Sequence, residues 1–226
     1  MIGVFDSGDG GLCTVENIRR IAPKSDICFL ADRENSPYGT KSRGEIISLV
    51  KKNLKRLSEA GADKILIACC TASTVFPFLT AEEKERAVPI IEATARLALK
   101  ESKSKKIGVI ATRATTLSGA FENSLKRISP DALVYTEEAQ ELVSLIENGA
   151  RDENLKKRDA EKIKEIISRI KNYPFDVLIL GCTHFPRLEK TISALTERKT
   201  VSSALAGAYE ILKYSQGDGS GRTIFI

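Results

Sequence analysis

The chain has 226 residues, of which 42% are hydrophobic and 29% charged, and its formal net charge is +5. This length allows one large or two small domains with a full core, and no apolar run approaches the roughly 20 residues that a membrane-spanning helix needs. The lysines cluster in predicted helices without interleaved aromatic residues, which is typical of solvated helix faces and argues against nucleic-acid binding. The start MIGVFDSG lacks an export signal, so we expect a cytoplasmic protein without membrane contact.

Short runs rich in Ile and Val alternate with helical patterns along most of the chain. Such runs are typical of buried strands in a parallel sheet, and the alternation predicts an α/β fold with its ligand site beyond the carboxyl ends of the strands. The predicted strands, in chain order, are residues 2–5, 26–30, 64–69, 88–91, 106–111, 132–135 and 176–181. The predicted helices are residues 12–21, 43–60, 93–102, 118–128, 139–148 and 154–172.

Two pairs of similar segments suggest an internal duplication. IGVFDSG begins at Ile2 and IGVIATR at Ile107, while KILIACCTAS and DVLILGCTHF align Cys69 with Cys182. A chance match between two Ile/Val-rich strands would explain the first pair alone, but both pairs together favour two similar α/β lobes with the site in the cleft between them. We expect an N-terminal lobe at 1–92, a second lobe at 93–205, and a segment at 206–226 that packs on the N-terminal lobe.

The five cysteines indicate free thiols. Their irregular spacing fits neither a disulfide framework nor a CxxC zinc pattern, and Cys13 and Cys28 are expected in the core. Cys69 ends one predicted strand and Cys182 follows another, so a pseudo-twofold arrangement of the lobes would make their thiols face each other across the cleft. Redox pairs normally come as CxxC at one helix start, which makes a disulfide-exchange pair the weaker alternative.

Two opposed acid/base groups are what inversion at a carbon requires, since one removes a proton from one face and the other returns a proton to the opposite face. A free thiol has a pKa near 8.5, so we expect the pKa of each thiol to be lowered by helix N-termini at Thr71 and Thr183. Asp6, at the end of the first strand, and His184 are the neighbouring groups that could share a proton with the thiols.

On these residues the chain resembles the glutamate racemases of the aspartate/glutamate racemase superfamily. The matching motifs occur in the family's order and cover nearly the whole chain. They are FDSGDGG (5–11), PYGTKS (37–42), ACCTAS (68–73), ATRATTLSG (111–119), LIENG (145–149) and LGCTHFP (180–186). GCTH alone is shared with aspartate racemases, whereas PYGTKS favours glutamate as the substrate.

The resemblance implies roles for individual residues. Cys69 would act on the D-isomer of glutamate and Cys182 on the L-isomer, with Asp6 and His184 as acid/base partners and Glu147 as a further helper. The residues that would hold the substrate are Asp6, Ser7, Pro37, Tyr38, Gly39, Cys70, Thr71, Ser73, Thr115, Thr183 and His184. Neutral donors of this kind suit a substrate rich in carboxylates.

The resemblance also implies how the protein works in the cell. Neither pyridoxal phosphate nor a metal is implied, D-glutamate would feed peptidoglycan synthesis, and a homodimer is common among such racemases.

Several candidates have purely structural interpretations as well. Asp6 could cap the helix that begins near Gly11, His184 could be a satisfied structural group, and Tyr38 could pack a turn. Glu147 lies near a helix C-terminus, which is a poor place for a carboxylate without a specific role.

The chain departs from the family pattern in several places. Cys70 stands where the family has an Asn that contacts substrate, and a thiol is a weaker hydrogen-bonding group than an amide, so weaker binding or altered specificity would follow. Ala114, Arg33 and Ser202 replace a usual Gly, Thr and Asp, and the chain is some tens of residues shorter than is usual. Two rival functions stay open: a racemase of aspartate or another amino acid, and a binding protein that kept the fold and lost turnover.

Overall fold

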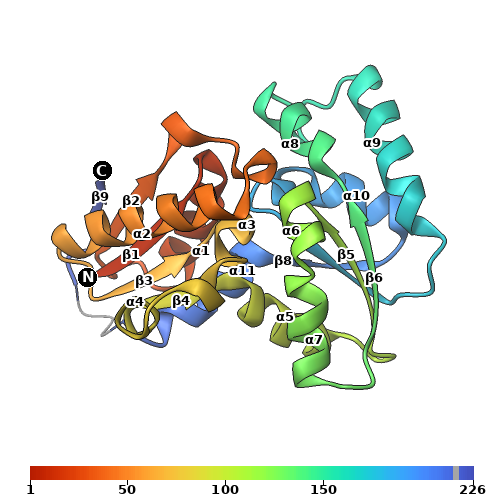
Figure 1. Cartoon of the computed structure of the whole chain (residues 1–226). Coiled ribbons are helices and arrows are strands. Elements are labelled where there is room, and N and C mark those ends of the chain that lie inside the picture. Colours follow the sequence, from red (N-terminus) through yellow and green to blue (C-terminus); the bar gives the residue numbers. More distant parts are fainter. Residues whose placement is uncertain (216–218) are drawn as a thin grey trace.

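The computed structural model describes residues 1–215 and 219–226, and within them the strands form two sheets flanked by helices (Figure 1). The N-terminal sheet has the order β4-β3-β1-β2-β9 and the C-terminal sheet the order β6-β5-β7-β8, with parallel pairing throughout. The strands are β1 (Ile2–Asp6), β2 (Ile27–Ala31), β3 (Lys64–Ile67), β4 (Ala87–Pro89), β5 (Lys106–Ala111), β6 (Leu133–Glu138), β7 (Val177–Gly181), β8 (Lys199–Ser202) and β9 (Thr223–Phe225). The predicted α/β fold with mainly parallel sheets is confirmed.

The helices connect and cover these strands. The α-helices are α1 (Leu12–Ile21), α2 (Arg43–Glu59), α3 (Cys70–Ser73), α4 (Ala81–Arg86), α5 (Ile90–Glu101), α6 (Arg113–Ser118), α7 (Ala120–Ile128), α8 (Gln140–Glu147), α9 (Lys157–Lys171), α10 (Glu189–Thr196) and α11 (Ser203–Leu212). Short 3₁₀ turns are η1 (Asp9–Gly11), η2 (Arg33–Asn35), η3 (Tyr38–Thr40), η4 (Phe76–Phe78) and η5 (Phe185–Leu188). Among the described residues, no helix is long and apolar enough to cross a membrane.

The segments paired by sequence occupy equivalent places in the two sheets. β1 and β5 are central, β2 and β6 lie on one side of them, and β3 and β7 on the other. The register agrees too: Gly3 of β1 pairs with Ile65 of β3, and Gly108 of β5 pairs with Leu178 of β7. Cys69 and Cys182 therefore follow equivalent strands at equivalent edges, which supports the duplication.

Local sequence sets the helix boundaries. α2 begins with a capping box, in which the Ser42 hydroxyl accepts from the backbone N–H of Glu45 and the Glu45 carboxylate accepts from the backbone N–H of Ser42. The helix predicted at 118–128 is wrong at its start, because Gly119 adopts a left-handed φ of 65° that separates α6 from α7.

Other differences from the expected elements have identifiable causes. Only the first half of VPII is strand, because α5 begins at Ile90 directly after Pro89. β6 was expected to be buried but is half-exposed, since it forms the edge of its sheet. β8, β9, α4, α10 and α11 were not predicted from the sequence.

One hydrophobic cluster joins the two sheets. It includes Val4 and Leu66 from the N-terminal sheet and Val109 and Ile179 from the C-terminal sheet. Helices α5 and α11 pack against each other, and α11 also packs on α1 (Figure 1). This shared core holds the two sheets in one arrangement, so the loops at their facing edges are placed relative to each other.

The last described strand returns to the start of the chain. β9 pairs in parallel with β2, so the C-terminus lies beside the N-terminal sheet (Figure 1). The lobe boundaries expected at 92/93 and 205/206 stay a prediction. The segment expected at 206–226 includes 216–218, which lie outside the described residues.

Candidate active site

Cys69 lies in the junction between β3 and α3. It is the N-cap residue of α3, and its Sγ lies 3.4 Å from the backbone nitrogen of Ala72, which donates to it. The hydroxyl of Ser7, from the loop after β1, lies 3.2 Å from the same sulfur. The thiol is 5% exposed, so both contacts act in a desolvated environment.

Cys182 follows β7 directly and has different neighbours. Its Sγ lies 3.7 Å from Nδ1 of His184, whose Nε2 lies 3.6 Å from Oε1 of Glu147. The three side chains form a row that runs from a buried thiol to a carboxylate that is 43% exposed. The structure therefore places three of the predicted acid/base residues, Cys182, His184 and Glu147, in one row.

Asp6 connects the loops of the two sheets. Its Oδ1 accepts from the backbone nitrogen of Gly8 at 2.9 Å, and its Oδ2 accepts from the hydroxyl of Thr183 at 2.9 Å. Gly10 makes this approach possible, because a Cβ there would lie 2.9 Å from Nδ1 of His184 and still closer to Oγ1 of Thr183. The Gly-rich loop after β1 thus packs directly on the GCTH segment after β7.

A ring of three buried hydroxyls forms a second bridge between the sheets. Thr71 of α3 lies 2.8 Å from Thr112 and 3.1 Å from Thr115, and the latter two are 2.9 Å apart. Thr112 was not predicted as a site residue. Its position directly after β5 was a usable signal, because side chains at that strand end face the same edge as Cys182.

The PYGT segment is held from both sheets. The hydroxyl of Tyr38 donates to Asp32 at 2.6 Å, and Asn53 also donates to Asp32, at 2.9 Å. Gly39 lies against Gln140 and Thr112 of the other half. Pro37 is exposed and precedes this turn.

Burial dominates the protonation of the thiols. It raises the pKa of Cys69 to about 11, with the charge of Asp6 adding to the effect, and raises the pKa of Cys182 well above its usual value. The lowered thiol pKa values expected from the helix N-termini are therefore wrong for this structure, since desolvation outweighs the hydrogen bonds to each sulfur. Cys69, Cys70 and Asp6 all raise the pKa of Cys182 through their charges, so these groups lie within electrostatic range of one another.

The pKa shifts of the acid/base partners all favour the uncharged form of each side chain. Burial raises the pKa of Asp6 to about 7, and burial together with the charge of Arg187 lowers the pKa of His184 to about 4. Burial also raises the pKa of Glu147, with the charge of Asp9 adding to it. At neutral pH the imidazole is thus uncharged.

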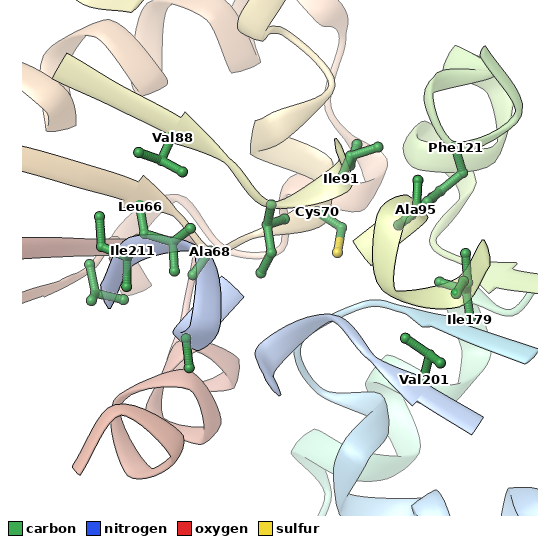
Figure 2. Packing of buried hydrophobic residues seen from close by; sticks show 14 of the residues in the cluster. Leu66, Ala68, Cys70, Val88, Ile91, Ala95, Phe121, Ile179, Val201 and Ile211 are labelled. Atoms are coloured by element: carbon green, nitrogen blue, oxygen red, sulfur yellow. The ribbon is translucent and has the colours of Figure 1, made fainter. Parts of the chain in front are cut away.

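Cys70 lies within electrostatic range of Cys182 but packs in the core, and Ser73 faces a different pocket. The Cys70 side chain is 1% exposed and belongs to the hydrophobic cluster between the sheets, near Ile91 and Ala95 (Figure 2). Ser73 lines a separate pocket of about 370 Å³ with Phe76 and Ile91. Contacts of Cys70 and Ser73 with a substrate stay predictions.

A pocket of about 340 Å³, called the entrance pocket below, leads to His184. It is lined from the N-terminal half by Gly8, Asp9, Arg33 and Ser36, and from the C-terminal half by Ile146, Glu147, Arg151, His184 and Arg187. Within the residues described, no group of three or more His, Cys, Asp or Glu side chains is arranged to hold a metal ion.

Comparison with known proteins agrees with this geometry. The chain is 35% identical over 227 residues to glutamate racemase from Aquifex aeolicus, covering 97% of this chain and 85% of the relative. The glutamate racemase isoform RacE1 from Bacillus anthracis superposes with a TM-score of 0.89 at 30% identity, over 100% of this chain and 86% of that one. A glutamate racemase from Francisella tularensis, solved in complex with D-glutamate, gives 0.87 at 30% identity, over 99% and 86%.

The duplicated sheets with a buried thiol at each equivalent strand end, together with these relatives, make the protein an amino-acid racemase. The sequence model of the Asp/Glu/hydantoin racemase family matches residues 14–211, and the chain belongs to this family.

Proposed function

We propose that this racemase interconverts L- and D-glutamate without a cofactor, by proton transfer between two cysteines. The observation that carries the proposal is the placement of Cys69 and Cys182 at equivalent strand ends of the two sheets, each buried beside its own polar partner. Glutamate is favoured as the substrate by the PYGTKS segment and by the relatives, which are glutamate racemases.

In the direction from L to D, the thiolate of Cys182 would take the α-proton and the thiol of Cys69 would deliver a proton to the opposite face of the carbon. The reverse direction exchanges these roles, so the enzyme with its substrate bound needs one thiolate and one thiol. His184, with its neutral imidazole, would receive the Cys182 proton. Because burial lowers the pKa of this imidazole to about 4, the imidazolium that forms would need stabilisation by Glu147 at 3.6 Å. Asp6, with a pKa of about 7, is suited to exchange a proton on the Cys69 side.

Substrate binding would supply the missing stabilisation of the thiolate. Both sulfurs are desolvated, which favours the neutral thiol. The ammonium group of an amino acid placed between them adds a positive charge in a region of low dielectric, which favours a nearby thiolate. The base is thus generated when the amino acid is in place rather than beforehand.

The carboxylates would be held by neutral donors. The hydroxyl of Ser7 lies beside the sulfur of Cys69, that of Thr183 donates to Asp6, and those of Thr71 and Thr115 contact each other between the two halves of the chain. A bound carboxylate would replace these partners rather than fill an unsatisfied site. Backbone contacts from Tyr38 and Gly39 belong to the same proposal.

Incubation of each glutamate enantiomer in D₂O tests the proposal. Both should exchange the α-proton for deuterium and lose optical activity. A panel with aspartate and other amino acids identifies the alternative substrate if glutamate is inert. Tight calorimetric binding of D-glutamate with no α-proton exchange would instead indicate a binding protein and reject turnover.

The cellular role is part of the same proposal. D-glutamate made by this enzyme would supply peptidoglycan synthesis in the cytoplasm. A homodimer is also proposed, and light scattering of the purified protein measures it directly.

A further inference from the structure

Nearly every charged side chain of the entrance pocket has a partner. Arg33 pairs with Asp9 at 2.7 Å, and Glu147 faces His184 at 3.6 Å. Arg151 donates to the backbone oxygens of Ile146 at 2.6 Å and Ala150 at 2.7 Å. These contacts satisfy the pocket's two carboxylates and two of its guanidinium groups.

Arg187 is the exception. Over residues 1–215 and 219–226, its guanidinium makes no hydrogen bond and no ion pair with another side chain or with the backbone. Its own backbone is fixed, since its nitrogen donates to His184 at 3.1 Å and its oxygen accepts from Asp152 at 3.0 Å. The side chain is half-buried, and its charge lowers the pKa of His184, which places a cation near the row that leads to Cys182.

An unpaired, half-buried guanidinium beside a pocket is unusual, because partial desolvation of a charge is unfavourable unless an anion compensates it. Its planar fork of donors matches a carboxylate in geometry. Within the described residues, the side chains that contact the two sulfurs are the hydroxyl of Ser7 and the neutral imidazole of His184, so the positive charge that an incoming anion meets lies in the entrance pocket. A net positive entrance of this kind raises the local concentration of anionic ligands.

We infer that Arg187 is the residue that captures the distal carboxylate of a dicarboxylate substrate at the entrance pocket, before the α-carbon passes between the thiols. This inference rests on the proposed function, and it adds a cationic contact to a site otherwise built from neutral donors. It concerns substrate capture, not proton transfer.

The test compares Arg187→Gln and Arg187→Lys with the wild type. The matched control is Arg86→Gln, which removes the same charge from an exposed position on α4, away from the entrance pocket. The measured quantities are kcat/KM and kcat for α-proton exchange of L-glutamate, and calorimetric binding of glutarate, a dicarboxylate that cannot be racemised. Each is measured at about 50 mM and about 1 M NaCl, where the Debye length falls from more than ~10 Å to ~3 Å.

At low salt, Arg187→Gln should lower kcat/KM and glutarate affinity about tenfold (~1.4 kcal/mol) while kcat stays within about twofold. The loss should shrink to less than about threefold at high salt, and Arg187→Lys, which keeps the charge but not the planar fork, should lose less affinity than Arg187→Gln. Arg86→Gln should match the wild type at both salt concentrations. Because the Arg187 guanidinium has no partner to lose within the described chain, the variants should also keep the wild-type thermal midpoint.

The outcomes separate this inference from the proposed function. Suppose that the wild type exchanges the α-proton of glutamate normally. The inference about Arg187 is then overturned if Arg187→Gln behaves like the wild type, if its loss is confined to kcat, or if its loss is equal at both salt concentrations. The racemase proposal stays intact in each of these cases. A wild type that does not exchange glutamate rejects the proposed substrate. In that case a salt-dependent loss of glutarate binding in Arg187→Gln still supports capture by Arg187, and unchanged glutarate binding overturns it.

Discussion

Replacing Asp6 by Asn should change how the stability of the protein depends on pH. The amide keeps an oxygen that can accept from Gly8, and its N–H group can donate to the hydroxyl of Thr183, so both neighbours found in the structure keep a partner. What the substitution removes is a titrating group that is completely buried. The difference between the two proteins therefore isolates the cost of ionising Asp6.

The magnitude follows from the pKa shift. Burial raises the pKa of Asp6 from 3.8 to about 7, so the folded wild type keeps a proton that the unfolded chain releases between these values. The unfolded state binds fewer protons in this window, hence the wild-type free energy of unfolding falls as pH rises. About three pKa units at 1.36 kcal/mol each give a loss of ~4 kcal/mol, complete above about pH 7. His184 titrates in both proteins and cancels in the comparison.

Urea unfolding followed by circular dichroism measures the effect. The free energy of unfolding of Asp6→Asn minus that of the wild type should increase by ~4 kcal/mol between about pH 4 and about pH 8. Glu161→Gln, an exposed carboxyl-to-amide change on α9, serves as the control for loss of one surface carboxylate. A difference that stays constant within ~1 kcal/mol, or that decreases with pH, would refute the assignment of a raised pKa to Asp6.

Further predictions concern the thiols and the hydroxyl ring. Cys69→Ser and Cys182→Ser should each slow α-proton exchange by about two to four orders of magnitude, since a serine hydroxyl is a far weaker acid; near wild-type turnover in either would end the two-thiol mechanism. Cys70→Ala should cost ~1 kcal/mol of stability through lost packing and leave KM within about threefold, whereas a rise above about tenfold would place the Cys70 thiol on the substrate. Thr112→Val should destabilise the protein by ~1–3 kcal/mol in thermal or urea unfolding, because Thr71 and Thr115 lose a buried partner; unchanged stability would show that the two hydroxyls satisfy each other.

The central strands could be predicted from sequence because their pattern is strong. IGVF, KILI, KIGVIA and VLILG are continuous apolar runs, and each proved to be a buried inner strand. The pattern was weaker where burial is partial. β8 is a four-residue strand with an exposed start, β9 has three residues, and α11 is built largely from small residues, so none of these offers the periodicity of an amphipathic element.

Sequence motifs predicted many residues of the candidate site. The remaining residues became apparent only from the structure, because no motif encodes their geometry. Asp6 contacts Thr183, and Gly10 lies against Thr183 and His184, because the loop after β1 packs on the segment after β7. Arg187 could not be distinguished from other basic residues by sequence, since its significance depends on a guanidinium that finds no partner in the entrance pocket. The direction of the thiol pKa shifts was missed because helix N-termini can be inferred from sequence while the degree of desolvation cannot.

The two equivalent but unlike surroundings of the sulfurs have a kinetic consequence. Mirror-image substrates have equal free energies in water, so the values of kcat/KM for the forward and reverse reactions of a racemase must be equal, whatever the protein does. The halves of this chain have nevertheless diverged around their sulfurs, with a serine hydroxyl on one side and an imidazole on the other. A substitution in either half must therefore change kcat/KM equally for both enantiomers, although the change can be divided differently between kcat and KM for each. Evolution can change how strongly each isomer saturates the enzyme but not which isomer accumulates.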